Sequence, residues 1–239
     1  MIAVLVILLA APAWEAALAR ADALAAAARA CEDADKDKKV AAALEAYAVV
    51  LAMRPKDGKL VPRVRRRRVS LLKHAGRPSE ALAELDRIVS GRARRKDKAR
   101  ALYDAGRLLE KGNDFHGAAL RYRRALDEYG DIVRVRAQAA LARGRVLEKM
   151  ARPREAERVY RFVVARCGDA VKEVIGAYDA LALLALTEKK PRIAQRWLRK
   201  CMSQFERRST RGDKYGALVA RLLGEMKAPV ALARFEMTK

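Results

Sequence analysis

Residues 106–125 read GRLLEKGNDFHGAALRYRRA, and the order of small, turn-forming and aromatic residues in this stretch decides the fold. Gly106 stands twelve positions before Ala118, and Tyr122 and Ala125 follow that alanine at helical spacing. The Asn-Asp pair between the two small residues favours a tight turn. The stretch therefore predicts two antiparallel helices that approach each other closely at the small residues.

The same pattern recurs along the chain with a period of about 38 residues, which is within the range of helical repeat proteins. The alanine recurs at nearly equal intervals, as Ala43, Ala81, Ala118, Ala156 and Ala194. Three positions before three of these alanines stands a proline, which suits the first turn of a helix because that turn leaves its N–H unpaired. The small residue twelve positions upstream recurs as Cys31, Gly106, Gly144 and Ala182, with Val69 as the exception. Such a period indicates a stacked repeat.

Composition agrees with an all-helical repeat protein. The 239 residues are 52% hydrophobic but only 5% aromatic, and Gly and Pro number 13 and 7, so the chain suits helices with few interruptions. There are 52 Lys and Arg against 29 Asp and Glu, a formal net charge of +23. That charge favours anionic partners and opposes self-association, but it says nothing about the fold.

An alanine, an aromatic residue four positions later and a small residue three further on resemble the tetratricopeptide repeat. Ala118, Tyr122 and Ala125, with Gly106 upstream, carry the resemblance best. The first repeat shows it as Ala43, Tyr47 and Val50, followed by Pro55. The period is longer than the family's usual length of about 34 residues, the first-helix Trp is absent, and the second and fifth repeats match weakly. The long repeat and the apolar start resemble exported envelope proteins of the outer-membrane assembly lipoprotein and Tol-Pal-associated groups.

The resemblance implies a right-handed α-solenoid of about five antiparallel helix pairs with a short C-terminal capping region. The predicted repeats are residues 20–57, 58–95, 96–132, 133–170 and 171–208, with a partial sixth unit at 209–239.

The first nineteen residues predict an export signal. Residues 1–11 form an unbroken apolar run of signal-peptide length, and Ala17 and Ala19 place small residues at a cleavage position. The absence of Lys or Arg before the run, together with Glu15, does not fit this pattern. We therefore keep two alternatives, an uncleaved anchor and a buried first helix of a cytoplasmic protein.

Three cysteines are too few for a disulfide framework and lack metal-ligand spacing. We expect buried free thiols. Pairing of Cys167 with Cys201 in an oxidising compartment is the alternative.

In solenoids of this kind the first helices of successive repeats line a concave groove. The partner-binding residues that this register predicts are Arg63, Arg66, Lys73, Arg100, Tyr103, Arg107, Lys111, Arg145 and Lys149. Guanidinium groups there suit carboxylates. The run Arg63-Val64-Arg65-Arg66-Arg67-Arg68 has few acids nearby in the sequence, so we expect many of its charges to be locally unpaired. Leu183 and Leu186 predict that the groove becomes apolar toward the C-terminal end.

The function predicted from these features is a non-catalytic scaffold or adaptor of the bacterial cell envelope that holds an acidic peptide or partner protein. The alternative is a binder of an anionic polymer or surface: nucleic acid, lipid head groups or polysaccharide. Nucleic acid is less favoured because exposed aromatic residues for base stacking are few. Peripheral association with a membrane stays open. We expect no cofactor, no metal and no catalytic constellation, since His74 and His116 lie near turns without a partner nucleophile.

Overall fold

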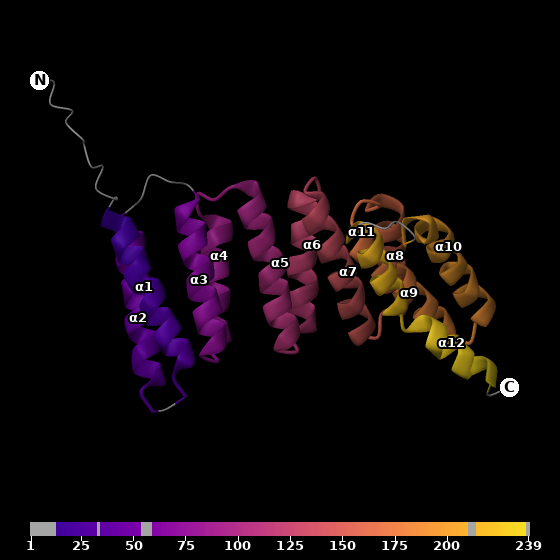
Figure 1. The fold of residues 1–239 in the computed structure, drawn as a ribbon, viewed down its shortest axis with the longest axis horizontal. Helices are drawn as coiled ribbons and strands as arrows, with labels where there is room; N and C mark the ends of the chain where they lie inside the picture. Colours follow the sequence, from indigo (N-terminus) through magenta and orange to yellow (C-terminus); the bar gives the residue numbers. More distant parts are fainter. Residues whose placement is uncertain (1–12, 33, 54–58, 210–213, 238–239) are drawn as a thin grey trace, which may run out of the picture. The chain divides into compact units, whose positions relative to one another are not determined.

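The computed structural model describes residues 13–32, 34–53, 59–209 and 214–237, and these residues form helices joined by short turns. The helices are α1 (Ala13–Ala30), α2 (Lys36–Ala52), α3 (Leu60–His74), α4 (Pro78–Ser90), α5 (Arg95–Lys111), α6 (Phe115–Tyr129), α7 (Val133–Lys149), α8 (Pro153–Arg166), α9 (Val171–Thr187), α10 (Pro191–Ser209), α11 (Lys214–Gly224) and α12 (Ala228–Met237). The chain is an all-α, tetratricopeptide-like solenoid of helix pairs, as predicted (Figure 1).

The helices belong to two compact units, residues 1–101 and residues 102–239, with the boundary inside α5. In the first unit, α1 packs against α2 and α3 against α4. Ala21, Ala25 and Ala28 of α1 are fully buried in the same apolar cluster as Ala43 and Tyr47 of α2. Because alanines have little side-chain volume, the two helices approach closely.

In the second unit, glycines of the first helices make room for tyrosines of the second helices. A Cβ atom added to Gly106 would lie 2.5 Å from the ring of Tyr122, and one added to Gly144 would clash with the ring of Tyr160 in the same way. The Tyr122 hydroxyl donates to Glu110 at 3.1 Å, and the Tyr160 hydroxyl donates to Glu148. In the third and fourth repeats, the pattern read from the sequence therefore corresponds to a glycine–tyrosine contact between paired helices.

The turn inside four of the helix pairs is also periodic. Gly76, Asn113, Ala151 and Lys189 all have positive φ, at 71°, 63°, 55° and 58°. The N–H of the following residue donates to the carbonyl five positions back, as from Asp114 to Leu109 at 2.9 Å. These are Schellman turns, which end the first helix through one left-handed residue.

The two last helices cap the second unit. α11 and α12 pack on α9 and α10. The carboxylate of Asp179 in α9 accepts hydrogen bonds from the backbone N–H groups of Lys227 at 2.9 Å and Ala228 at 2.7 Å. Asp179 therefore acts as the N-cap of α12 from another helix, a role that sequence reasoning missed because the two segments are 48 residues apart.

The predicted export signal lies partly outside the described residues, which begin at Ala13. The predicted cleavage position at Ala19 falls inside α1, where Leu18 is buried and Trp14 packs on the same cluster. Export stays a prediction. Pro55, which carried part of the resemblance, lies outside the described residues.

Cys31, Cys167 and Cys201 are buried and form no disulfide. Burial raises the pKa of Cys201 to about 12, assisted by the nearby Asp179 charge, and burial also raises the pKa of Cys167. Cys31 lies in the turn after α1, so the small-residue position of the first repeat falls outside its helix. Among the helices of the described residues, none combines the length and the hydropathy that a membrane span requires.

Candidate functional site

Four of the five arginines in the run of α3 bind acids of other helices, so they lack partners nearby in the sequence, as expected, but they are not unpaired. Arg65 and Arg68 both bind the carboxylate of Glu84 in α4, with N–O distances of 2.8 and 3.1 Å. Arg67 pairs with Asp22 of α1. The acceptors lie sixteen or more residues away in sequence, so local spacing gave no sign of them.

Arg66, one of the predicted partner-binding residues, is engaged in the same way. Its guanidinium lies 2.7 Å from the buried carboxylate of Asp97, which Arg94 also binds at 2.8 Å. Burial alone would raise the pKa of Asp97, but the hydrogen bonds from Arg94 and Arg66 outweigh it and lower the pKa below the ordinary 3.8. Arg66 therefore has a structural role in this unit.

The other predicted residues of the first unit lie at the surface. Arg63 and Lys73 of α3 and Arg100 of α5 are exposed. Arg63 and Lys73 form no ion pair with any described residue. These two side chains can therefore meet an external anion.

Three predicted residues come together in the second unit. Tyr103 of α5 is half-buried, with its ring centroid 5.8 Å from that of Tyr122. Burial raises the pKa of Tyr103, and the charges of Arg107 and Arg145 act on its phenol in the opposite direction. Arg107 comes from α5 and Arg145 from α7, so two helices contribute to one place. Both arginines are exposed and form no ion pair within the described part of the chain.

Two lysines flank this cluster. Lys111 is exposed at the end of α5. Lys149 of α7 binds Glu110 at 2.9 Å, and its ammonium lies 5.2 Å from the Phe115 ring centroid. Lys149 therefore links neighbouring helix pairs and is less available than Lys111.

Leu183 and Leu186, predicted to make the groove apolar, are partly buried. They pack on a small cluster that includes Ala185 and Ala228. Since Ala228 begins α12, the C-terminal cap reaches this side of α9.

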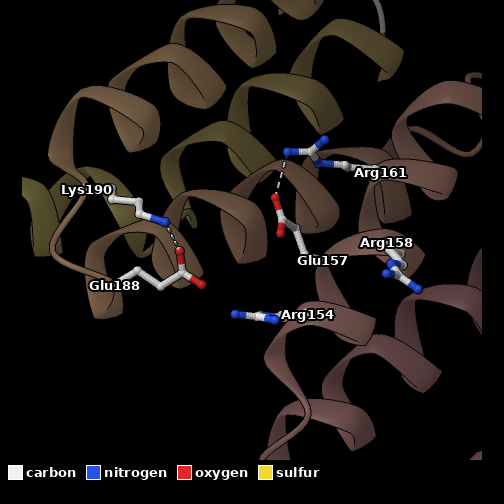
Figure 2. Close-up of a pocket in the computed structure, with 6 residues that line it drawn as sticks. All are labelled: Arg154, Glu157, Arg158, Arg161, Glu188 and Lys190. Carbon is white, nitrogen blue, oxygen red and sulfur yellow. Dashed lines mark hydrogen bonds and ion pairs between the residues drawn. The ribbon is translucent and has the colours of Figure 1, made fainter.

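A second basic surface lies on the second helices, outside the groove that the sequence predicted. An open depression with a cavity volume of about 680 Å³ is lined by Arg154, Glu157, Arg158, Arg161, Glu188 and Lys190. In Figure 2, Glu157 pairs with Arg161 and Glu188 with Lys190, while Arg154 and Arg158 join neither pair. A further depression of about 520 Å³ is lined by Arg192, Gln195, Arg196, Arg199, Lys200 and Ser203 of α10.

These surfaces present cations to solvent. No group of three or more His, Cys, Asp or Glu side chains able to hold a metal ion occurs among the described residues. His74 and His116 are exposed. The arrangement suits binding of carboxylates or phosphates by guanidinium groups.

No protein-family model matches the sequence. No curated protein matches it either. Among solved structures, the chain is similar to the crystal structure of MamA, with a TM-score of 0.52, 18% identity and coverage of 76% of this chain and 99% of that one. The structure of BtubC (BKLC) from P. vanneervenii gives a TM-score of 0.48 at 16% identity, over 95% of this chain and 91% of that one. The likeness to MamA shows the fold, a tetratricopeptide-like helical solenoid.

Proposed function

We propose that this protein is a non-catalytic interaction scaffold of the bacterial cell envelope that holds an acidic segment of a partner protein. The observation that carries the proposal is that Arg107 and Arg145, on two first helices of the second unit, are both exposed and both close enough for their charges to act on the phenol of Tyr103. Two exposed guanidinium groups that form no ion pair with a described residue suit an external carboxylate, and the tyrosine ring offers apolar contact.

No ion pair with a described residue ties these two arginines to the fold, which supports a binding role for them. The arginines that do stabilise the fold, Arg65 and Arg68, are paired with the buried Glu84. Arg107 and Arg145 make no such pair within the described residues. Lys111 lies on the same helix as Arg107, so it adds positive charge on the partner side.

The test is partner capture by the full chain from extracts of its own cells, followed by measurement of affinity for the captured protein. The variant Arg107→Gln/Arg145→Gln should lose at least tenfold in affinity, since two charge-assisted contacts are removed. The matched control is Arg154→Gln/Arg158→Gln, which removes the same charge from the second-helix surface. Equal affinity of the first variant and the wild type would rule out this site.

The envelope location is tested separately. Terminal mass spectrometry of the protein from fractionated cells should find a mature chain that begins near Arg20 outside the cytoplasm. An intact Met1 in the cytoplasmic fraction would contradict export and leave acidic cytosolic partners as candidates.

A further inference from the structure

The outer face of α8 and α10 displays two identical rows of arginines. Arg154, Arg158 and Arg161 of α8 recur one repeat later as Arg192, Arg196 and Arg199 of α10. Within each row the side chains stand four and then three residues apart, so they share one helix face over about 10 Å. We call these six residues the arginine rows.

α8 and α10 both pack on α9, and the first row reaches α10 through Arg161. The guanidinium carbon of Arg161 lies 5.6 Å from the ring centroid of Trp197 in α10, and the Lys200 ammonium lies 5.0 Å from it. Trp197 is itself anchored on Tyr178, with 6.2 Å between ring centroids. Neighbouring helices therefore present one basic surface, fixed by an aromatic residue between them.

Within the described residues this surface is only partly neutralised. Its nearby acids already have partners, because Glu157 binds Arg161 and Glu188 binds Lys190, both at 2.7 Å. The side chains that form no ion pair with any described residue are Arg154, Arg158, Arg192, Arg196, Arg199 and Lys200.

α6 provides a contrast within the same unit. Its outer arginines are neutralised along the helix, Arg123 by Asp127 at 3.4 Å and Arg124 by Glu128 at 2.6 Å. Among the second helices of this unit, the excess charge is therefore concentrated on α8 and α10.

Exposed apolar side chains accompany the arginine rows. Phe162 of α8 and Ile193 and Met202 of α10 are exposed by about two fifths, at 40%, 38% and 43%. Unpaired arginines interleaved with exposed apolar residues are typical of surfaces that lie at a lipid interface.

We propose that the arginine rows form a docking surface for a membrane rich in anionic phospholipids. Lipid head groups move laterally and can meet each guanidinium separately, whereas a protein partner must present carboxylates in a matching pattern. Single-stranded nucleic acid fits less well, because cations cover Trp197, the aromatic ring that bases would stack on. With this surface on a membrane, the first-helix cluster of Tyr103, Arg107 and Arg145 would serve a separate partner, so this inference goes beyond the proposed function.

The experiment is co-sedimentation of the full chain with two kinds of vesicle, phosphatidylcholine alone and an equal mixture of phosphatidylcholine and phosphatidylglycerol. The wild type should bind the anionic vesicles at least tenfold more tightly, and binding should weaken as salt rises from about 0.05 M to about 0.3 M. Equal binding to both vesicles, or binding to neither, would overturn the proposal.

The variant Arg154→Gln/Arg158→Gln/Arg192→Gln/Arg196→Gln should lose roughly tenfold or more in affinity for anionic vesicles. The matched control is Arg63→Gln/Lys73→Gln/Arg107→Gln/Arg145→Gln, which removes the same charge from the first helices. This control should change the affinity for anionic vesicles less than about twofold. Equal losses in both variants would mean that net charge alone drives binding, which overturns the proposal. All four positions in the first variant are exposed, and an unchanged circular-dichroism melt will show that it folds.

Two further outcomes distinguish the occupants. If the arginine-row variant loses affinity for labelled RNA or for polyglutamate while its vesicle binding is unchanged, the surface serves nucleic acid or an acidic protein and the membrane proposal is wrong. Partner capture by this variant should match the wild type, so failure of either proposal leaves the other standing.

Discussion

Contact between Gly144 and Tyr160 limits how closely α7 and α8 pack. A Cβ atom at position 144 would overlap the tyrosine ring, whose hydroxyl is held by Glu148. Gly144→Ala should therefore lower the free energy of unfolding by about 1–3 kcal/mol through overpacking. Urea denaturation followed by circular dichroism measures the loss.

Gly168 and Tyr160 provide the checks on this effect. Gly168→Ala has no heavy atom within 4 Å of the added Cβ and should change stability by less than about 0.5 kcal/mol. Adding Tyr160→Leu to Gly144→Ala should give less than the sum of the two single effects, because the clash disappears with the ring. Strict additivity would show that the two residues do not interact.

Asp97 should make the stability of the first unit depend on pH. Because its pKa is lowered in the folded protein, its contribution to stability is complete above the ordinary 3.8 and is lost as pH falls through the folded value. Asp97→Asn should cost about 1–3 kcal/mol at neutral pH, since Arg66 and Arg94 lose a charged acceptor. Urea titrations at several pH values measure the difference in free energy of unfolding between the variant and the wild type, which should shrink below pH 3.8. A difference that stays constant with pH would contradict this role of Asp97.

The turns between first and second helices carry a conformational cost at Ala151 and Lys189. Both have positive φ, which disfavours residues with a Cβ, while Gly76 fills the equivalent place without that cost. Ala151→Gly and Lys189→Gly should each stabilise the protein by about 0.5–1 kcal/mol, and Gly76→Ala should destabilise it by about 1 kcal/mol. Thermal melts of the three variants test the sign of each change, and a loss of stability in both glycine variants would contradict the turn assignment.

At the scale of helices, the sequence was sufficient to predict the fold because its signals are local. A small residue, a turn and a tyrosine occur together in the third and fourth repeats, where they correspond to Gly106 against Tyr122 and Gly144 against Tyr160. The first repeat is less regular, since Cys31 lies beyond the end of α1.

The candidate site was only partly predictable. The partners of Arg65, Arg66 and Arg68 are Glu84 and Asp97, which lie on later helices and approach only on folding. The recurrence of the α8 arginines one repeat later was present in the sequence but lay on the second helices, outside the predicted groove.

At the scale of the whole molecule, a solenoid distributes stability among neighbours, so a local defect should stay local. Gly144→Ala disturbs α7 and α8 in the unit of residues 102–239. Native-state hydrogen exchange followed by mass spectrometry should show loss of amide protection in α7–α10 and unchanged protection in α1 and α2. Gly76→Ala should give the converse result, with the loss in α3 and α4, because Gly76 lies in the unit of residues 1–101. If either substitution lowers protection equally in all helices, the chain opens as one cooperative body, and nearest-neighbour stacking does not govern its stability.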